Sequence, residues 1–338
     1  MRLLYLNKYT LFGVKMATSI IATGSQLPKR IVKNEEIEKE LMLKHGWIKH
    51  RCGVVQRHFL DNESFLDMAV LAAKNAFDKS PANANDIDLI ILATTTPQQI
   101  MPSTAVLIQH SLGIEHCMAF DLQAACSGFV YGLHIADSMM QASNFKYAMV
   151  LGCDAFSKIV NPADPMTSIL FGDGFGAVIL ENNQQNTDRG IFYKDSGSGA
   201  QDIVHLNIPW GVAQGFNNIA KISPYVAMNG REVFKSAVLR FTNEVEKALT
   251  ATKIRIEDVR FIITHQANVR IIEAVCKNLH TTLDKFVITV SQHGNTSAAS
   301  IPLALDQLFD SGQLVRGDIL MLTGFGAGFT WGTIMLQH

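Results

Sequence analysis

Three residues of this chain have side chains suited to covalent chemistry on a carbonyl group. Cys126 lies in the stretch AFDLQAACSGFVYGL, His265 follows the apolar run VRFIIT, and Asn295 lies in HGNTSAAS. The thiolate is the reactive form of cysteine, and its pKa falls at a helix N-terminus or beside a base. Histidine and asparagine can donate hydrogen bonds to a thioester carbonyl or manage protons. These residue types predict a cysteine nucleophile supported by two polar groups.

Each of the three residues also has a purely structural interpretation. A cysteine before a helix is often a small buried apolar residue, and an asparagine before TSAAS is a suitable helix cap. A histidine after a strand often serves only as a structural hydrogen bonder. His293, in the same stretch as Asn295, is a second candidate histidine. The order Cys–His–Asn also occurs in papain-like proteases, although the chain lacks their disulfide-rich secreted setting.

The elements that position these residues repeat along the chain. In the first half, the strand-like runs DIDLIILATTT and YAMVLGCDA flank the segment that contains Cys126. In the second half, IEDVRFIITHQAN and DILMLTGFGAG flank the segment that contains Asn295. Apolar strands that alternate with helical segments predict βαβ units and mostly parallel sheets. We expect Cys126 and Asn295 to begin equivalent helices, with His265 close by at the carboxyl end of its strand.

The repeat predicts a chain of two related halves after a short extension. Polar residues, Gly and Ser gather in the region 181–225 and indicate where the halves join. The extension precedes a second methionine, Met16, which we interpret as the functional start; a weak targeting segment is the alternative. The predicted parts are an extension, a half with the cysteine, and a half with the histidine and asparagine: residues 1–15, 16–185 and 186–338.

The composition narrows the class of protein. The formal net charge is −1, and hydrophobic residues make up 48% of the chain, which predicts a globular protein with a large core. Such a charge gives no general reason to expect nucleic acid or an anionic membrane as a partner. The five cysteines show no CxxC spacing, so we expect no metal site and no disulfide framework, as in a reducing cytoplasm. The glycines of GDG and GFGAG do not fit a dinucleotide or phosphate loop.

Several longer blocks of sequence resemble the β-ketoacyl-[acyl-carrier-protein] synthase III family of the thiolase superfamily. The likeness runs from about Thr18 to the end of the chain. The blocks that carry it are ATGSQLPKRIVKNEEIE, WIKHRCGVVQRH, AACSGF, LFGDGFGAVIL, NGREVFK, HQANVRII, HGNTSAAS and GFGAGFTWG. The resemblance implies an α/β duplicated thiolase fold, layered α-β-α-β-α, with two mostly parallel five-stranded sheets related by a pseudo-two-fold axis. It also implies a homodimer.

The resemblance further implies an activity. A family member takes an acyl group from acyl-CoA, such as acetyl-CoA, and condenses it with malonyl-ACP (ACP, acyl carrier protein). Carbon dioxide and CoA are released, and the 3-oxoacyl-ACP product starts fatty acid biosynthesis. No further cofactor is implied. The alternative is a related acyltransferase or condensing enzyme of secondary metabolism with another acyl donor or acceptor.

Roles for individual residues also follow from the resemblance. Cys126 matches the nucleophile that holds the acyl group, and His265 and Asn295 match the pair that promotes loss of CO₂ from the malonyl thioester. Backbone N–H groups of Cys126 and Ala327 match the oxyanion hole. Phe325 matches an aromatic residue packed beside the site of decarboxylation.

Other matches concern substrate carriers and the dimer. The predicted CoA-binding residues are Trp47, Arg51 and Asn268. The predicted ACP-docking residues are Lys235, Arg270 and Lys277. Met101 matches a residue that crosses the dimer interface to the acyl pocket. The chain departs from the family pattern at Pro165, where many members have arginine, and at Arg231, where many have asparagine; these departures motivate the alternative function.

Overall fold

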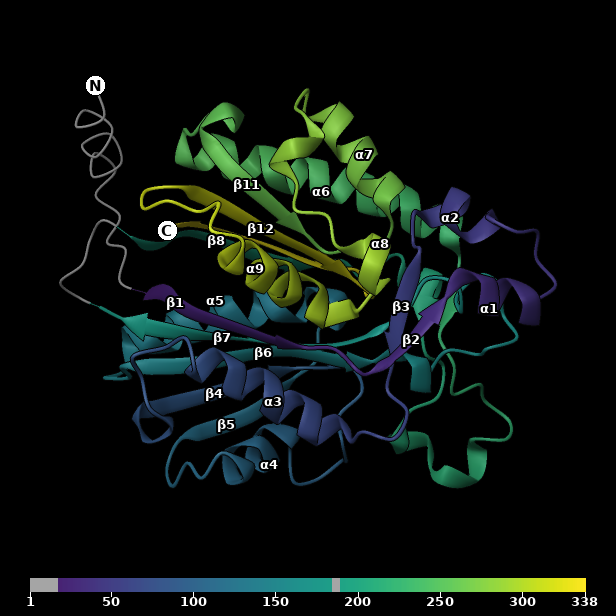
Figure 1. The fold of residues 1–338 in the computed structure, drawn as a ribbon, viewed down its shortest axis with the longest axis horizontal. Helices are drawn as coiled ribbons and strands as arrows, with labels where there is room; N and C mark the ends of the chain where they lie inside the picture. Colours follow the sequence, from purple (N-terminus) through teal and green to yellow (C-terminus); the bar gives the residue numbers. More distant parts are fainter. Residues whose placement is uncertain (1–17, 184–188) are drawn as a thin grey trace.

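The molecule is built in five layers, in which two sheets alternate with three layers of helices (Figure 1). The computed structural model describes residues 18–183 and 189–338. Helices α5 and α9 lie between the sheets, α3 and α4 cover the outer face of the first sheet, and α6 and α7 cover that of the second. The predicted α-β-α-β-α layering is therefore confirmed.

The first sheet has the strand order β1-β7-β6-β4-β5. Strand β4 pairs in parallel with both β5 and β6, whereas β7 pairs antiparallel with β6 and β1. Strands β4, β6 and β7 are covered by helices on both faces of the sheet. Their central residues are apolar, as burial on both faces requires. Its strands are β1 (Thr18–Gln26), β4 (Ile87–Ala93), β5 (Met118–Leu122), β6 (Tyr147–Ala155) and β7 (Asp173–Asn182).

The second sheet has the order β11-β12-β13-β8, with a parallel pair at β11 and β12 and antiparallel pairs beyond. Within the described residues it contains four strands, so the expectation of five is corrected here. Its strands are β8 (Gly190–Ser198), β11 (Val259–Thr264), β12 (Ile319–Gly326) and β13 (Thr330–Gln337).

A side chain explains why the fifth strand does not form. The segment that corresponds to β5 meets β11 through an isolated bridge between Phe286 and Ile262. Beyond the bridge, the amide of Gln266 donates to the Val287 carbonyl at 2.9 Å, and its oxygen accepts from the Thr289 N–H at 3.1 Å. Gln266 thus satisfies backbone groups that a strand ladder would otherwise pair.

The distribution of apolar residues on each helix matches the layer in which the helix lies. Both inner helices are apolar around most of their circumference, since they face a sheet on each side. The outer helix α7 is amphipathic and buries Ile271, Ile272 and Val275. The helices are α1 (Asn34–Glu40), α2 (Trp47–Cys52), α3 (Phe65–Phe77), α4 (Thr104–Ser111), α5 (Gly128–Ala142), α6 (Gly230–Thr252), α7 (Val269–Asn278), α8 (Val290–His293) and α9 (Ser300–Asp310). Short strands β2 (Arg30–Lys33) and β3 (Gln56–Phe59) form one pair, and β9 (Leu206–Asn207) and β10 (Ala227–Met228) form another.

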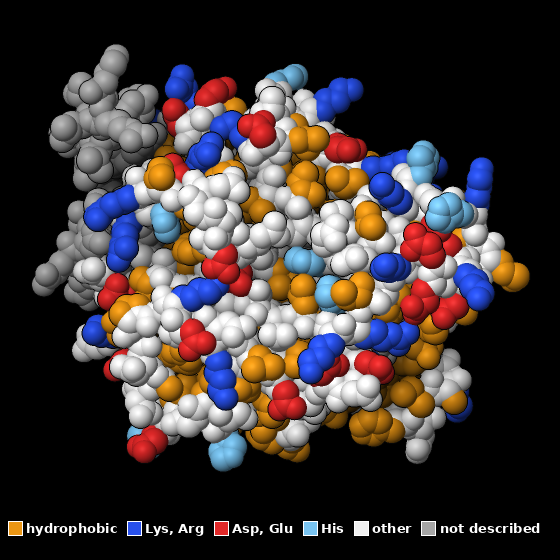
Figure 2. Space-filling model, viewed as in Figure 1, with side chains coloured by type: hydrophobic (Ala, Val, Ile, Leu, Met, Phe, Trp, Pro, Cys, Tyr) orange, Lys and Arg blue, Asp and Glu red, His pale blue; other side chains and the backbone are white. Residues whose placement is uncertain are grey.

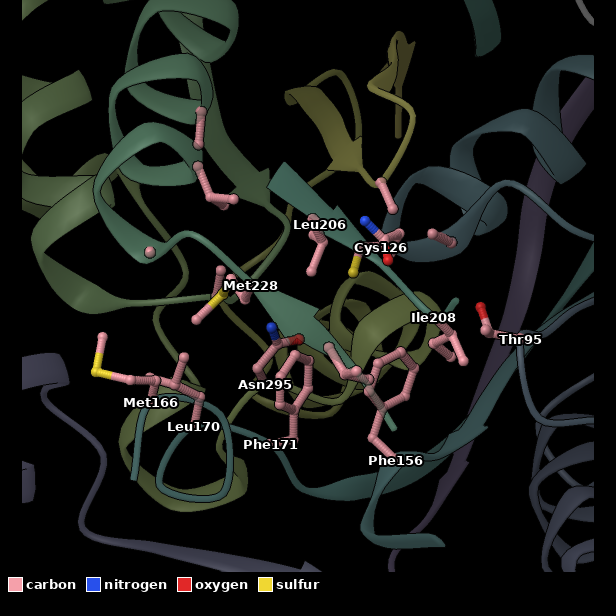
Figure 3. A pocket seen from close by; sticks show the side chains of 18 of the residues that line it. Thr95, Cys126, Phe156, Met166, Leu170, Phe171, Leu206, Ile208, Met228 and Asn295 are labelled. Atoms are coloured by element: carbon pink, nitrogen blue, oxygen red, sulfur yellow. The ribbon is translucent and has the colours of Figure 1, made fainter. Parts of the chain in front are cut away.

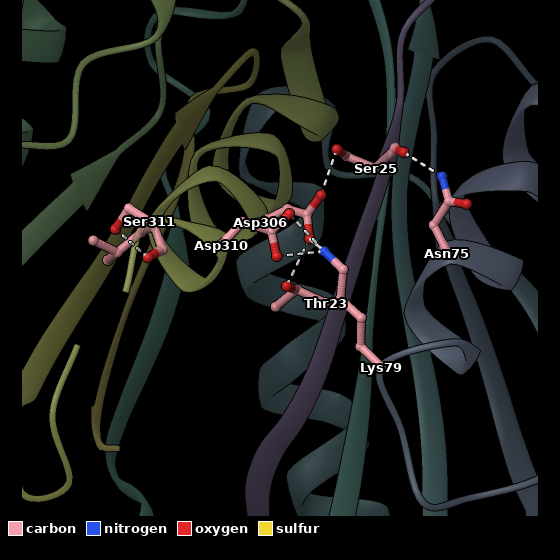
Figure 4. A network of polar contacts seen from close by, with 8 residues as sticks. Thr23, Ser25, Asn75, Lys79, Asp306, Asp310 and Ser311 are labelled. Carbon is pink, nitrogen blue, oxygen red and sulfur yellow. Dashed lines mark hydrogen bonds and ion pairs between the residues drawn. The ribbon is translucent and has the colours of Figure 1, made fainter. Parts of the chain in front are cut away.

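A polar network ties the inner helix α9 to the first sheet (Figure 4). The carboxylate of Asp306 accepts hydrogen bonds from the hydroxyls of Thr23 at 2.7 Å and Ser25 at 2.6 Å. The Lys79 ammonium bridges Asp306 at 2.8 Å and Asp310 at 2.6 Å. Because α9 belongs to the second half of the repeat, these contacts fix one half against the other.

The predicted division of the chain stays a prediction. Residues 1–15 lie outside the described residues, and so does the predicted boundary between residues 185 and 186. Among the helices in the described ranges, none is long and apolar enough to cross a membrane.

Candidate active site

Two matching turns bring the predicted reactive residues to the centre of the molecule. One is the 3-10 turn Ala125–Ser127, which leads into α5, and the other is Ser297–Ala299, which leads into α9. Each begins with a residue in the left-handed region, Ala125 at φ 47° and Ser297 at φ 51°. Aligned on these residues, Cys126 corresponds to Ala298. The expectation that Asn295 begins the equivalent helix is therefore wrong; Asn295 precedes the turn.

Glycines let each turn approach the sheet of the opposite half. A Cβ on Gly152 of β6 would lie 2.2 Å from the Ala298 carbonyl oxygen. A Cβ on Gly326 of β12 would lie 2.8 Å from the Cys126 nitrogen. Real Cβ atoms do not come so close to backbone, so glycine is required at both positions for the turns to meet.

A cavity of about 1250 Å³ opens beside the two turns and is lined by Cys126, His265 and Asn295. Figure 3 shows the Cys126 sulfur and the Asn295 amide turned toward the same space. Much of the remaining wall is apolar and includes Phe156, Phe171 and Leu206. The structure thus brings together the three residues that the sequence singled out.

The thiol of Cys126 is buried and protonated at neutral pH. Burial raises its pKa to about 12, the nearby Asp154 carboxylate acts in the same direction, and a hydrogen bond from Ser297 opposes them. The Ser297 hydroxyl donates to the sulfur at 3.4 Å. The expectation of a lowered thiol pKa at a helix N-terminus is not met, because desolvation outweighs the helix end.

His265 is a neutral imidazole in this environment. It is 3% exposed, and burial lowers its pKa to about 3 against a hydrogen bond to the Ser297 backbone. Among the described residues, its Nδ1 atom has no hydrogen-bond partner. A neutral ring can donate from one nitrogen, so His265 can act as a neutral donor toward a ligand.

Asn295 is held so that its amide nitrogen remains available. Its side-chain oxygen accepts the Ser297 N–H at 2.9 Å. Its backbone donates to the Leu170 carbonyl at 2.8 Å and accepts from the Gly172 N–H at 2.9 Å. With the oxygen engaged, the NH₂ group is left to donate into the cavity.

Phe325 and Ala327 also line the cavity, next to Cys126. A hydroxyl pair holds their loop against the cysteine turn: the hydroxyls of Ser127 and Thr330 lie 2.7 Å apart, and the Thr330 hydroxyl lies 3.1 Å from the carbonyl oxygens of both Ala124 and Ala327. The rings of Phe325 and Phe329 pack 4.6 Å apart.

The residues predicted to contact CoA and ACP divide into two groups. Those that line the cavity are Arg51, Asn268, Lys235 and Arg270. Trp47 does not line it but lies under Arg51, whose guanidinium is 5.2 Å from the ring. Lys277, predicted to dock ACP, is exposed and lies away from the cavity wall, and so does Met101, which was predicted to reach the acyl pocket across the dimer interface.

The charged side chains that line the cavity are all positive. The cations that line it are Arg51, Lys158, Arg231, Lys235 and Arg270, and no Asp or Glu is among the described lining residues. Arg270 donates to the His50 carbonyl, and Lys235 pairs with Glu232 at 2.9 Å. This distribution suits a ligand that carries negative charge.

Sequence reasoning missed Asp154 and Ser297, which surround the thiol, and Lys158. Asp154 is the last residue but one of the apolar strand YAMVLGCDA, and an acidic residue near the end of such a strand was the available signal. Ser297 lies inside the quoted block HGNTSAAS, but its side-chain partner is distant in sequence. In the two described ranges, no group of three or more His, Cys, Asp or Glu side chains is placed to hold a metal ion.

Comparison with known proteins identifies the family. The family described as 3-Oxoacyl-[acyl-carrier-protein (ACP)] synthase III matches residues 120–198, and its C-terminal counterpart matches residues 249–338. A β-ketoacyl-[acyl-carrier-protein] synthase III of Wolbachia pipientis is 43% identical over 322 residues, covering 94% of this chain and 98% of the relative.

Solved structures agree with this relationship. The crystal structure of 3-oxoacyl-[acyl-carrier-protein] synthase III from Aquifex aeolicus has a TM-score of 0.88 at 37% identity, covering 95% of this chain and 100% of that one. A priming β-ketosynthase from a polyketide biosynthetic pathway has a TM-score of 0.90 at 28% identity, with 96% and 97% covered. The chain belongs to the β-ketoacyl-[acyl-carrier-protein] synthase III family, condensing acyltransferases with the duplicated thiolase fold.

Proposed function

We propose that this protein is a β-ketoacyl-ACP synthase III, which condenses a cysteine-bound acyl group with malonyl-ACP and so initiates fatty acid biosynthesis. One observation carries the proposal: one cavity collects Cys126, His265 and Asn295 from both halves, and the charged side chains among its described lining residues are all cations. The family relationship at 43% identity over nearly the whole chain supports the same activity.

In the first half-reaction, Cys126 attacks the thioester carbonyl of an acyl-CoA. The sulfur forms a bond to the acyl carbon, and the CoA thiol departs. The backbone N–H groups of Cys126 and Ala327 are the proposed oxyanion hole. A Cβ at position 326 would lie 2.8 Å from the Cys126 nitrogen, so glycine there leaves this N–H uncovered by a side chain and supports its proposed role as an oxyanion donor.

In the second half-reaction, His265 and Asn295 bind the carbonyl oxygen of malonyl-ACP. The bond to the carboxylate breaks, CO₂ leaves, and the electron pair forms an enolate whose oxygen both groups stabilise. The carbanion then attacks the acyl-cysteine to give 3-oxoacyl-ACP and free Cys126. Phe325, packed against Phe329, forms the wall beside this step.

The cations of the cavity are proposed to bind the phosphates of the two carriers. Arg51 with Trp47 and Asn268 would hold CoA, and Lys235, Arg270 and the exposed Lys277 would dock ACP. Arginine pairs well with phosphate, and tryptophan offers a stacking face for adenine. No metal or other cofactor takes part in the proposed chemistry.

A second copy of the chain is the remaining proposed partner. Strand β5 forms an edge of the first sheet, and nearby Met101, Ile100 and Met118 are 79%, 63% and 50% exposed. An unpaired edge beside exposed apolar side chains favours pairing with another chain. In such a homodimer, Met101 would reach the acyl pocket of the partner subunit. All five cysteines are free, which supports a cytoplasmic location.

Secondary metabolism is the alternative, motivated by Pro165 and Arg231. The argument from Pro165 is that the chain lacks an arginine that many family members have, and the position of Arg231 weakens it. Met166, next to Pro165, would lie 3.7 Å from a Cβ on Gly230, so Arg231 stands beside the loop that lacks the family's arginine. Arg231 lines the cavity and supplies a positive charge there.

The test is condensation of acetyl-CoA with malonyl-ACP by the purified protein. We expect 3-oxoacyl-ACP and CO₂ at a rate typical of enzymes, about 1 s⁻¹ or more. Asn295→Ala should still take up the acetyl group but form no product. Acetylation without condensation by the unaltered protein, together with transfer to an alcohol or amine acceptor, would favour the alternative function.

A further inference from the structure

Ser297 contacts several residues of the site, and the proposed function gives its side chain no role. Its backbone N–H supports Asn295, and its backbone also reaches His265. Its side chain points elsewhere: the hydroxyl lies 3.4 Å from the Cys126 sulfur, and a hydrogen bond from the Ser297 side chain lowers the pKa of the Asp154 carboxyl against the effect of burial. One buried hydroxyl therefore connects the thiol to a buried acid.

Asp154 is fully buried, and neutral groups make its hydrogen bonds. Its Oδ1 atom accepts the Thr95 N–H at 2.7 Å, together with the N–H of Thr96 and the hydroxyls of Thr94 and Thr96. Its Oδ2 atom accepts the N–H of Ala298, the residue after Ser297, at 3.1 Å. One oxygen is thus saturated, whereas the other retains capacity to take up a proton.

We propose that Cys126, Ser297 and Asp154 form a thiol relay, in which the Ser297 hydroxyl passes the thiol proton to Asp154 during acyl transfer. This inference rests on the proposed function, since it concerns its first half-reaction. In the structure the Ser297 hydroxyl donates to the sulfur; when its proton rotates toward Asp154, the same oxygen can accept from the S–H group while it donates to the carboxylate. Ser297 touches the reacting sulfur and is the catalytic member; Asp154 acts through it.

Every proton that moves in this step is given and taken up by the three residues of the relay or by the departing CoA. The S–H bond breaks as its proton moves to Ser297 Oγ, and the serine's own proton moves to Asp154 Oδ2. The sulfur electron pair forms the bond to the thioester carbon. When the C–S bond to CoA breaks, the relay runs in reverse and protonates the departing CoA thiolate.

The protonated thiol of Cys126 needs a base that removes its proton during acyl transfer. The other titratable side chains around it are Cys153, a neighbour of Asp154, and His265. The pKa of His265 is about 3, so this imidazole is a weak base, and burial raises the pKa of Cys153. Burial also raises the pKa of Asp154, which makes it a better proton acceptor than an ordinary carboxylate.

Ser297→Ala is the first test, and the equivalent position of the other turn already holds an alanine. Ala125 adopts the same left-handed conformation in the matching turn, so alanine is compatible with position 297. The variant keeps the backbone N–H that holds Asn295. We expect single-turnover acetylation of Cys126 by acetyl-CoA, followed by intact mass, to slow by about 10²-fold. Decarboxylation of malonyl-ACP should be unchanged, which a merely structural role would not predict.

Ser300→Ala is the matched control. Ser300 follows the turn directly as the first residue of α9, and its buried hydroxyl contacts Thr296 at 3.3 Å. Acetylation at the unaltered rate is expected. Equal slowing of acetylation by Ser300→Ala and Ser297→Ala would overturn the relay, because any disturbance of the turn would then explain the effect.

Asp154→Asn separates proton transfer from simple electrostatics. Removing the charge should lower the pKa of Cys126, measured as the pH dependence of its alkylation by iodoacetamide, whereas Ser297→Ala should raise it. The relay nevertheless predicts slower acetylation in both variants, and no further loss in the double variant. Asp154→Asn acetylating at or above the unaltered rate would overturn the proposal. If this variant does not fold, the serine variants still decide. Failure of the unaltered protein to acetylate at all would instead reject the proposed function.

Discussion

The two turns that meet at the centre share one backbone and differ in what they carry. Ala125 and Ser297 have nearly equal positive φ angles, and each turn rests on a glycine of the opposite sheet. In the first turn the next residue is Cys126, and in the second it is Ala298. The strand end that faces the first turn is Gly326, whereas Asp154 faces the second.

We propose that this difference gives the duplicated fold a single reactive centre. The Ala298 N–H is occupied by the Asp154 carboxylate, whereas the Cys126 N–H faces a residue without a side chain. We propose that the first turn keeps its Cys126 N–H for a ligand, whereas the second turn, bonded to Asp154, positions His265, Asn295 and Ser297. The duplication gives both turns the same backbone geometry, and a few residue differences give them the different proposed roles.

Moving the cysteine between the turns should have the largest effect. In Cys126→Ala combined with Ala298→Cys, we expect complete loss of the acetyl adduct, because the amide at position 298 is already bonded to Asp154. Intact mass after incubation with acetyl-CoA measures this. An adduct at position 298 would mean that the turns are interchangeable and the comparison is wrong.

Removing the support of the second turn should cost less. His265→Ala should slow condensation by about 10²–10⁴-fold while Cys126 is still acetylated, since the imidazole is proposed to act only on the malonyl group. Product formation and adduct formation are measured on the same sample. Slowing of both steps to the same extent would show that the two turns do not have separate tasks.

Filling the glycine contacts should destabilise the protein measurably. Gly152→Ala and Gly326→Ala each place a Cβ within 3 Å of backbone, and overpacking of this kind costs about 1–3 kcal/mol or more of unfolding free energy. Gly211→Ala is the control, because nothing lies within 4 Å of a Cβ there and its φ is −150°. Urea denaturation midpoints test this; unchanged midpoints for Gly152→Ala and Gly326→Ala would argue against close contact of the turns.

The smallest effect concerns pH. Burial lowers the pKa of His293, just before the second turn, to about 4, so the unfolded chain binds its proton at higher pH than the native protein. The stability from keeping this ring neutral is present above its ordinary pKa of about 6.5 and decreases as the pH falls toward 4, by up to about 1.4 kcal/mol per unit. His293→Gln should reduce the loss of stability between about pH 7 and pH 5, in urea midpoints; an equal loss in both proteins would contradict this.

The sequence predicted the fold well and singled out three residues that the structure places in one cavity, because both features leave local signals. Apolar strand runs and repeated turn segments indicated the layers, and Cys126, His265 and Asn295 lay in quoted motifs. The four-stranded second sheet was not predictable, since Gln266 replaces strand pairing through contacts that only folding creates. The raised thiol pKa of Cys126 depends on burial, which its helix-start position did not reveal.

Asp154 and Ser297 illustrate the same limit. They lie 144 and 171 residues from their partners Ala298 and Cys126, so no spacing rule links them to the site. Lys277 and Met101 remain predictions for a different reason: their proposed partners are other molecules, and their exposure alone does not assign a role.

The division of tasks between the turns is tested most directly by locating the acyl group. The unaltered protein is incubated with acetyl-CoA, quenched, digested and mapped by mass spectrometry over its five cysteines. We predict one acetyl group per chain, on Cys126, which malonyl-ACP then removes as 3-oxoacyl-ACP. An acetyl group on another residue, or an adduct on Cys126 that malonyl-ACP cannot discharge, would contradict the account.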